Sequence, residues 1–173
     1  SLDGNRLVVG ADGGDGVSDS DLAVGEVYLF SFSDNVFSSA VVEGIIGAGY
    51  LGTKDLDLSA ELSDDDRLGS SVSLDGNRLA IGATQDDGLS LGAANYGAVY
   101  LLSFSDSLFS DPTLEAVIGS GKTDTKDLDL ATTLDAGDFF GSSVSLDGTR
   151  LVVGALGDDG AIDSNNGSGA VYL

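Results

Sequence analysis

The chain has no cysteine, histidine, methionine or tryptophan. Without cysteine no disulfide can form, and without thiol or imidazole groups the usual nucleophile–base pairs of hydrolytic enzymes are missing. Because thiol, thioether and imidazole groups are all missing, a metal ion is expected to bind only through oxygen ligands. A chain without oxidisable sulfur also suits an exposed, extracellular setting. These absences predict a protein that is not an enzyme and that acts outside the cell or at the cell surface.

Basic residues are scarce as well. Only 7 lysines and arginines face 29 aspartates and glutamates, which gives a formal net charge of −22. Such a surface repels phosphate groups, so we expect no nucleic-acid partner and no attraction to anionic membranes. No apolar run approaches the ~18 residues of a membrane helix, so we expect no membrane insertion. Hydrophobic residues still make up 42% of the chain, which is enough for a core and argues against disorder.

What the chain does contain is a repeat with a period of 72 residues. Ser-Leu-Asp-Gly-Asn-Arg-Leu begins at Ser1 and again at Ser73, and Ser-Leu-Asp-Gly-Thr-Arg-Leu begins at Ser145. The period defines repeat units 1–72 and 73–144 and a partial unit 145–173. Self-similarity at one period is typical of repeat architectures whose units bury their apolar faces against their neighbours. We therefore expect part of a longer array, with further copies of the same repeat as partners, in a longer chain or by self-assembly.

Within each unit, short β-branched runs alternate with turns rich in aspartate and glycine, and no segment shows the 3.6-residue apolar period of a helix. The first unit indicates a hairpin turn at 3–5 followed by strands at 6–11, 27–32 and 41–46. The segment 54–58 fits either a short edge strand or the crossover to the next unit. The pattern predicts an all-β fold with about four antiparallel strands per unit. The residues expected to pack between adjacent sheets are Leu7, Val9, Val27, Leu29 and their equivalents.

Three short elements recur in the same order in successive units. They are Leu-Gly-Ser-Ser-Val at 68–72 with Phe-Gly-Ser-Ser-Val at 140–144, Leu-Ala-Ile-Gly-Ala at 79–83 with Leu-Val-Val-Gly-Ala at 151–155, and Gly-Ala-Val-Tyr-Leu at 97–101. This arrangement resembles the FG-GAP repeat of integrin α-chain-type β-propellers, especially the bacterial branch found in large surface proteins. The resemblance implies β-propeller-like blades, in an open array or as part of a closed propeller. It also implies a role in attachment or cell-surface scaffolding.

Two features depart from the family pattern. The proline of the Gly-Ala-Pro element is replaced by Asp12, Thr84 and Leu156. The family's calcium loop lies between the first two strands of a blade, and that position holds only the turn Asp75-Gly76-Asn77. The resemblance therefore does not carry the family's calcium site over to this chain.

The loops after each Gly-Ala pair are a separate candidate for calcium. Asp15, Asp87 and Asp159 are equivalent, and each precedes a glycine. Calcium favours six to eight oxygen ligands, and glycine lets the backbone turn its carbonyl groups toward an ion. A bound calcium ion and a plain solvated turn both fit the pattern. The candidate metal ligands are Asp12, Asp15, Asp19, Asp21, Asp87, Asp158, Asp159 and Asp163.

Other recurring side chains are interpreted as determinants of the fold. The arginines and lysines of each unit are expected to pair with a nearby aspartate of the same blade. The tyrosine of the third strand is expected in the core. These positions are Arg6, Arg78, Arg150, Lys54, Lys126, Tyr28, Tyr100 and Tyr172.

The leading hypothesis is a non-enzymatic, extracellular tandem-repeat protein, structural or adhesive, that forms a cell-surface adhesin or fibre. No catalytic residue is predicted, because an active site is one asymmetric constellation and these residues recur once per unit. The alternative is a calcium-dependent β-propeller that recognises a protein or glycan ligand on its loop face.

Overall fold

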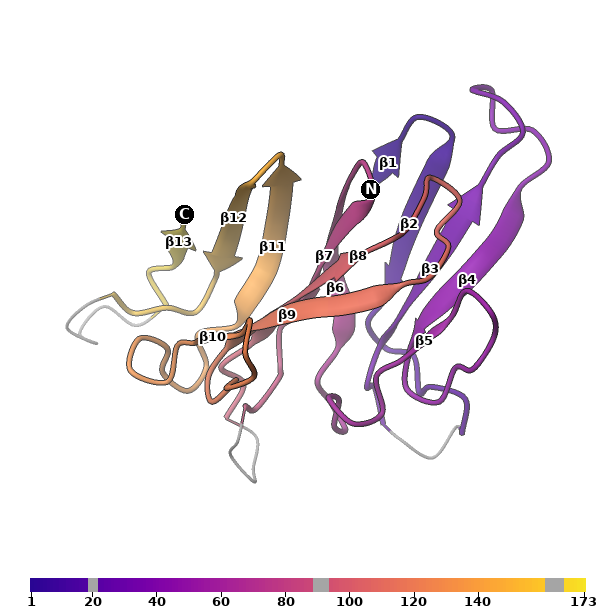
Figure 1. Cartoon of the computed structure of the whole chain (residues 1–173). Coiled ribbons are helices and arrows are strands. Elements are labelled where there is room, and N and C mark those ends of the chain that lie inside the picture. The colour runs from indigo at the N-terminus through magenta and orange to yellow at the C-terminus, as the bar shows by residue number, and fades with distance from the viewer. Residues whose placement is uncertain (19–21, 89–93, 161–166) are drawn as a thin grey trace.

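A computed structural model describes residues 1–18, 22–88, 94–160 and 167–173, and these ranges contain strands, turns and loops but no helix (Figure 1). Membrane-spanning helices are accordingly not found in the described part of the chain. The strands form three successive sheets that lie side by side along the molecule. The expected all-β class is therefore confirmed, and the sheets form an open row that does not close on itself.

The first sheet shows the order of strands within a unit. Its first four strands are antiparallel neighbours in chain order, and a two-residue fifth strand runs parallel to the fourth. The strands are β1 (Leu2–Asp3), β2 (Arg6–Ala11), β3 (Glu26–Ser31), β4 (Val41–Gly47) and β5 (Leu56–Asp57). The segment 54–58 thus supplies a short edge strand, one of the two alternatives that the sequence left open.

The second sheet repeats this order, and the third contains the first three strands of it. The second consists of β6 (Leu68–Asp75), β7 (Arg78–Ala83), β8 (Ala98–Ser103), β9 (Thr113–Gly119) and β10 (Leu128–Asp129). The third consists of β11 (Phe140–Asp147), β12 (Arg150–Ala155) and β13 (Ala170–Tyr172). Each opening hairpin turns at a glycine with positive φ, namely Gly4, Gly76 and Gly148. Glycine adopts this conformation without strain, which is why Asp-Gly-Asn and Asp-Gly-Thr mark these turns.

Two hydrophobic cores hold the sheets together, one at each junction between neighbours. The first junction lies between the first and second sheets and buries Val8, Val27, Leu29 and Ile46 against the second sheet's Leu79, Ile81, Tyr100 and Leu102. The second junction lies between the second and third sheets and includes Ala80, Val99, Phe140 and Val153. The middle sheet therefore has both faces covered, while each outer sheet has one.

One prediction about the core is wrong for the first sheet. Leu7 and Val9 were expected between adjacent sheets, but Val9 is 40% exposed and Val8 is the buried neighbour, at 1%. Side chains alternate between the two faces of a strand, and Val8 points toward the second sheet. The equivalents of Leu7 and Val9 in the second sheet, Leu79 and Ile81, are fully buried because a sheet lies in front of them. Val27 and Leu29 are fully buried, as predicted, whereas their equivalents in the third sheet, Val171 and Leu173, are exposed.

Candidate functional site

The residues that recur most strictly meet at the junctions between sheets. Gly69 of the Phe-Gly element packs on Gly10 of the preceding sheet's Gly-Ala element, and Gly141 packs on Gly82 in the same way. A Cβ atom on Gly10 would lie 1.9 Å from the carbonyl oxygen of Gly69, and one on Gly82 would lie 2.1 Å from that of Gly141. Both family glycines thus serve one contact, in which the backbones of two sheets touch.

The backbone also crosses each junction directly. The Leu68 amide donates to the Val24 carbonyl across the first junction, and the Phe140 amide donates to the Tyr96 carbonyl across the second, each at 2.9 Å. The glycine that follows each acceptor, Gly25 or Gly97, has a φ of 84° or 83°. Its missing side chain leaves room for the next strand. The Phe-Gly strand is therefore fixed to the preceding blade as well as to its own.

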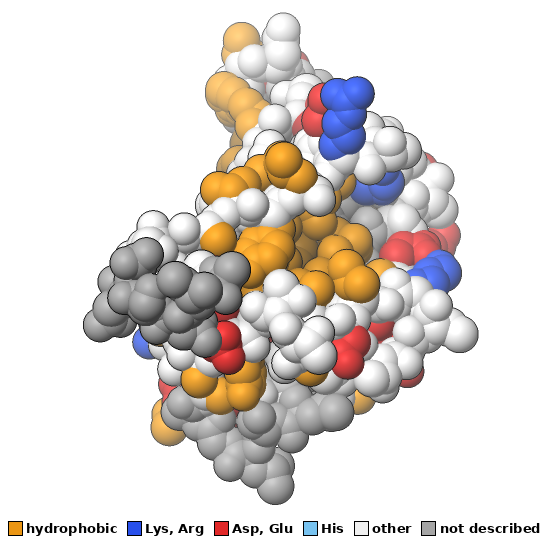
Figure 2. Space-filling model, turned by 90° about the vertical axis from the view of Figure 1, so that its left-hand side faces the viewer, with side chains coloured by type: hydrophobic (Ala, Val, Ile, Leu, Met, Phe, Trp, Pro, Cys, Tyr) orange, Lys and Arg blue, Asp and Glu red, His pale blue; other side chains and the backbone are white. Residues whose placement is uncertain are grey.

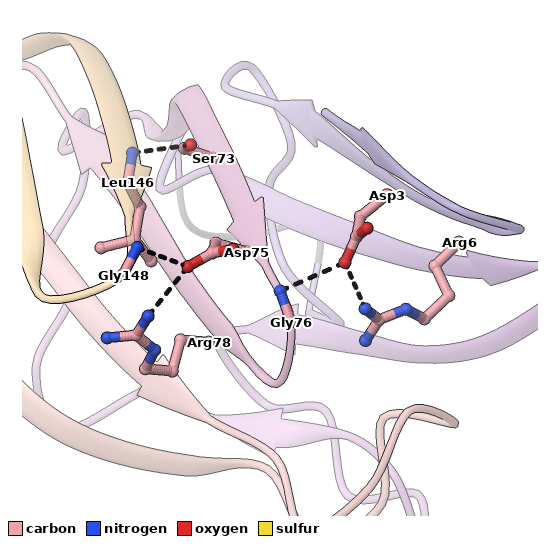
Figure 3. Close-up of polar contacts among 8 residues, drawn as sticks. All are labelled: Asp3, Arg6, Ser73, Asp75, Gly76, Arg78, Leu146 and Gly148. Atoms are coloured by element: carbon pink, nitrogen blue, oxygen red, sulfur yellow. Dashed lines mark hydrogen bonds and ion pairs between the residues drawn. The ribbon is translucent and has the colours of Figure 1, made fainter.

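A ladder of hydrogen bonds to side chains joins the opening hairpins of successive sheets (Figure 3). The Leu74 amide donates to the Ser1 hydroxyl and the Leu146 amide to the Ser73 hydroxyl, each at 3.0 Å. The Gly76 amide donates to the Asp3 carboxylate (3.1 Å) and the Gly148 amide to the Asp75 carboxylate (2.8 Å). Every contact joins residues 73 positions apart, so each unit holds the next in the same way.

Arginine completes this ladder. Arg6 donates to Asp3 (2.5 Å) and Arg78 to Asp75 (2.8 Å), which confirms the predicted pairing within a blade for these two arginines. In each pair the same carboxylate oxygen also accepts the amide of the next sheet. The arginine therefore orients the aspartate for its contact across the junction.

An aromatic ring covers the arginine of the ladder at the first junction. Phe109 lies in the β8–β9 connection of the second sheet, is fully buried, and stacks its ring 5.5 Å from the Arg6 guanidinium carbon. Arg6 is consequently 7% exposed. Its equivalent Arg78 borders an apolar groove of about 400 Å³ that includes Leu79, Leu102, Leu146 and Leu151. Figure 2 shows hydrophobic side chains around a hollow on the side of the molecule that carries the third sheet.

A second recurring feature is a hydrogen bond between the tyrosine of the third strand and a carboxylate. Tyr100 donates to Asp86 (2.8 Å) and Tyr172 to Asp158 (2.5 Å). Burial, together with these carboxylates, raises the pKa of both tyrosines above the ordinary value. Both hydroxyls therefore stay protonated and act as donors. Tyr100 lies in the core, as predicted.

The first unit keeps this pair with different residues. Tyr28 donates to Glu26 (2.6 Å), which stands where the other units have alanine, while Gly14 stands where they have Asp86 and Asp158. A Cβ atom on Gly14 would lie 2.7 Å from the Glu26 side chain. The loss of one carboxylate thus makes room for another, and the hydrogen bond survives although the acceptor comes from a different strand.

Two buried carboxylates meet beside Tyr100. Asp86 is paired with Lys122 at 3.0 Å, and Asp66 is 2% exposed. Asp66 accepts the Ser63 amide through Oδ2 (2.7 Å), while its Oδ1 has no hydrogen-bond partner among the described residues. Burial, and then the negative charge of Asp86, raise the pKa of Asp66 to about 7. Burial also raises the pKa of the equivalent Asp138.

The predicted calcium ligands have other partners in their loops. The carboxylates of Asp15 and Asp87 accept backbone amides across their own loops, from Ala23 (2.9 Å) and from Ala94 (2.8 Å). Asp159 accepts the Gly167 amide in the same manner. These equivalent aspartates therefore close the loops with a hydrogen bond.

The remaining candidate calcium ligands do not lie together in one site. Asp12 lies 3.9 Å from Arg67 at an exposed position, and Asp158 is bound to Tyr172. Asp19, Asp21 and Asp163 lie outside the described residues. Within the described ranges, no three acidic side chains are grouped so that they would hold a metal ion. The calcium hypothesis thus stays a prediction about these loops.

The two lysines that recur at equivalent positions pair with glutamate and not with the adjacent aspartate. Lys54 forms an ion pair with Glu43, and Lys126 with Glu115. The aspartates beside them, Asp55 and Asp127, accept backbone amides instead. The glutamates also accept from the serine that ends the third strand, which helps to hold the third and fourth strands together. These pairs explain why Glu43 and Glu115 recur.

The geometry defines a class of protein: successive blades of the β-propeller type, packed face to face in an open array. The chain belongs to the FG-GAP repeat family, whose model matches residues 59–102 and 130–173. Each matched segment covers nearly all of the first three strands of its sheet, which contribute to the junction with the preceding sheet. FG-GAP repeats indicate a β-propeller-type protein, a class that is often extracellular and adhesive. No curated protein shows significant similarity to the chain.

Proposed function

We propose that the protein is a non-enzymatic structural or adhesive component of the cell surface, in which FG-GAP blades build an extended adhesin or fibre. The observation that carries the proposal is that both junctions between sheets are built from the same contacts. Glycine contact, backbone bridge and Ser–Asp ladder recur at both with the same residue types. The recurring residues thus serve the attachment of one blade to the next.

The recurring hydrogen bonds of the tyrosines support the same proposal. The hydroxyl groups of Tyr28, Tyr100 and Tyr172 are bound to carboxylates in the blade. Tyr100 is fully buried, and a buried polar group with such a partner stabilises a unique packing. Recurrence in every unit suits a fold determinant and does not suit a catalytic constellation. A net charge of −22 also suits a surface component, since like-charged molecules stay apart in solution.

Labelling of intact cells tests this proposal. Antibodies raised against the chain are expected to label unpermeabilised cells of the source organism and to lose their target after brief external protease treatment. Electron microscopy of the labelled material is then expected to show continuous filaments or extended stalks. A signal that requires permeabilisation, or isolated closed discs on a stalk, would contradict the fibre proposal.

Recognition of a protein or glycan ligand with calcium is a second candidate function. It is favoured by a pocket of about 620 Å³ at the loop end of the third sheet, bordered by Asp135, Asp138, Asp158 and Tyr172. In the second sheet the Lys122 ammonium group is paired with Asp86, the equivalent of Asp158. A pocket with this acidic border suits a cationic group. Calcium-dependent binding of cells or glycans to the immobilised chain would favour this candidate over the first.

A further inference from the structure

A lysine and an aspartate form a buried pair in the second sheet. We propose that Lys122 and Asp86 condense to an amide, so that a covalent bond joins their side chains. Asp86 lies in the β7–β8 connection and Lys122 in the β9–β10 connection. The cross-link ties these two connections together at the end of the sheet where β8 begins, in a chain that has no cysteine for a disulfide. The inference goes beyond the proposed function and does not depend on where the protein is located.

Contact and burial are the first argument. The Lys122 Nζ atom lies 3.0 Å from Oδ2 of Asp86, and the two side chains are 13% and 3% exposed. Groups held in such contact react at effective concentrations far above those of free molecules. Burial disfavours charged forms, and the neutral amine is the form that attacks a carboxyl carbon. Exclusion of water also protects the amide from hydrolysis.

A third buried group, the carboxyl group of Asp66, gives the second argument. Asp66 is 2% exposed, and its Oδ1 atom has no hydrogen-bond partner in the part of the chain that the structure describes. Burial, and then the charge of Asp86, raise the pKa of Asp66 to about 7, while the charge of Lys122 lowers it. Asp66 therefore lies within electrostatic reach of both reacting groups. Its free oxygen can take up and release a proton near neutral pH, as a proton shuttle requires.

The step needs no further reactant, since one ammonium group and one carboxylate contain the atoms of an amide and a water. A proton passes from Lys122 Nζ to Oδ2 of Asp86, and Nζ then attacks Cγ to form the C–N bond. The charge that develops on Oδ1 faces the Gly88 amide, which donates to that oxygen at 2.8 Å. Asp66 takes a second proton from Nζ and delivers it to Oδ2, which leaves with the bonding electrons as water. Asp66 is a carboxylate again at the end of the step.

The other two lysines of the chain form pairs that do not meet these conditions. Lys54 pairs with Glu43 and Lys126 with Glu115, and the lysine side chains are 26% and 67% exposed. In each pair the hydrogen bond from the lysine lowers the pKa of the glutamate, which therefore stays an ionised carboxylate. An ionised carboxylate resists attack by an amine. One cross-link per chain is therefore expected.

Mass spectrometry of the intact, purified chain tests the proposal. The wild type is expected to be lighter than its sequence by the mass of one water molecule. Lys122→Arg keeps a positive charge beside Asp86 but cannot form the amide, so this variant is expected to have its full mass. Lys126→Arg changes the exposed lysine, is the matched control and is expected to keep the loss of water.

Digestion of the denatured chain with trypsin locates the bond. Trypsin requires a free lysine side chain, so it is expected to skip Lys122 and to release residues 79–126 as one peptide that lacks one water. A cyclic imide between Asp87 and Gly88 would also remove one water, but it would leave cleavage after Lys122 intact. The digest of the wild type therefore decides the question even if a variant does not fold.

The role of Asp66 has its own variant. Asp66→Asn is expected to slow the condensation on the order of a hundredfold, so that it keeps its full mass in samples in which the wild type has reacted. Circular dichroism establishes that this variant is folded. A wild type of full mass, a loss that persists in Lys122→Arg, or an Asp66→Asn chain that reacts as fast as the wild type overturns the inference. Full mass would leave the surface location untouched, which the labelling of intact cells decides separately.

Discussion

The glycine contact at the junction makes a sharp prediction about Gly82→Ala and Gly154→Ala. The two glycines occupy the same motif position in the second and third sheets. A Cβ atom at either would meet the hydroxyl of a serine in its own sheet, Ser71 or Ser143, at 2.5 Å. Only at Gly82 would it also meet the backbone of a following sheet, the Gly141 carbonyl oxygen at 2.1 Å. The pair therefore isolates the contribution of the junction.

The expected magnitude follows from that geometry. An ordinary contact begins near 3.4 Å, so Gly82→Ala requires the sheets to move apart by about 1.3 Å. Backbone atoms cannot rotate away, and a gap of about 0.5–1 Å already forfeits roughly a quarter to a half of the dispersion energy across the contact. The hydrogen bond from the Ser71 hydroxyl to the Gly141 carbonyl (2.7 Å) is lost as well, which costs about 1 kcal/mol. We expect Gly82→Ala to lower the free energy of unfolding by about 3 kcal/mol.

Equilibrium unfolding in urea, followed by far-UV circular dichroism, measures this difference. Gly154→Ala is expected to cost under about 1 kcal/mol, because the exposed Ser143 side chain can turn away. Gly13→Ala, with open space around the new methyl group and no positive φ, is the neutral control. Equal destabilisation by Gly82→Ala and Gly154→Ala would refute the reasoning, since the junction would then contribute nothing.

Three further predictions concern the carboxylates. Burial raises the pKa of Asp66 from 3.8 to about 7, so the folded state binds the proton more tightly than the unfolded state. The free energy of unfolding is therefore expected to fall by up to about 4 kcal/mol as the pH rises from 4 to 7. Asp66→Asn should flatten this pH profile in urea titrations, and an unchanged profile would contradict the prediction. Glu26→Ala leaves Tyr28 without its acceptor and should lower the melting temperature. The double variant Glu26→Ala with Gly14→Asp copies the arrangement of the second unit and should recover most of the lost stability. No recovery would refute the equivalence of the two acceptors. Millimolar calcium is expected to raise the melting temperature more than magnesium or matched sodium chloride. The double variant Asp15→Asn with Asp159→Asn keeps an oxygen that can accept the loop amide and should remove this gain. Equal shifts with all three salts would contradict a calcium site.

The repeat made much of the fold predictable. A contact between residues 73 positions apart follows naturally from a 72-residue period, and Asp-Gly-Asn specified the hairpin turn through its need for positive φ. The faces of the strands were harder to assign. Leu7 and Val9 look the same as Leu79 and Ile81 in sequence, and only the presence of a sheet in front of them separates exposed from buried. Alternation gives two faces of a strand but does not say which face has a neighbour.

The candidate site was less predictable, because its polar contacts depend on distances across the sheets. The clustered aspartates suggested a metal, while the structure shows Asp15 and Asp87 binding amides of their own loops. The tyrosine–carboxylate pair was missed, although the sequence carried a signal: Gly14 and Glu26 change together relative to Asp86 and Ala98. Such an exchange between two positions indicates contact, but one sequence with three copies offers few comparisons.

The central claim is that each blade is stabilised by its neighbours through the junctions. The most direct test is to insert a second copy of residues 68–139 after position 139, in register with the repeat, and to compare urea unfolding with that of the parent chain and of residues 68–139 alone. The account predicts that the isolated unit is unfolded or aggregated and that the extended chain is more stable than the parent, because it gains one complete junction. An isolated unit that unfolds cooperatively as a monomer, with the stability of the parent chain, would contradict the claim.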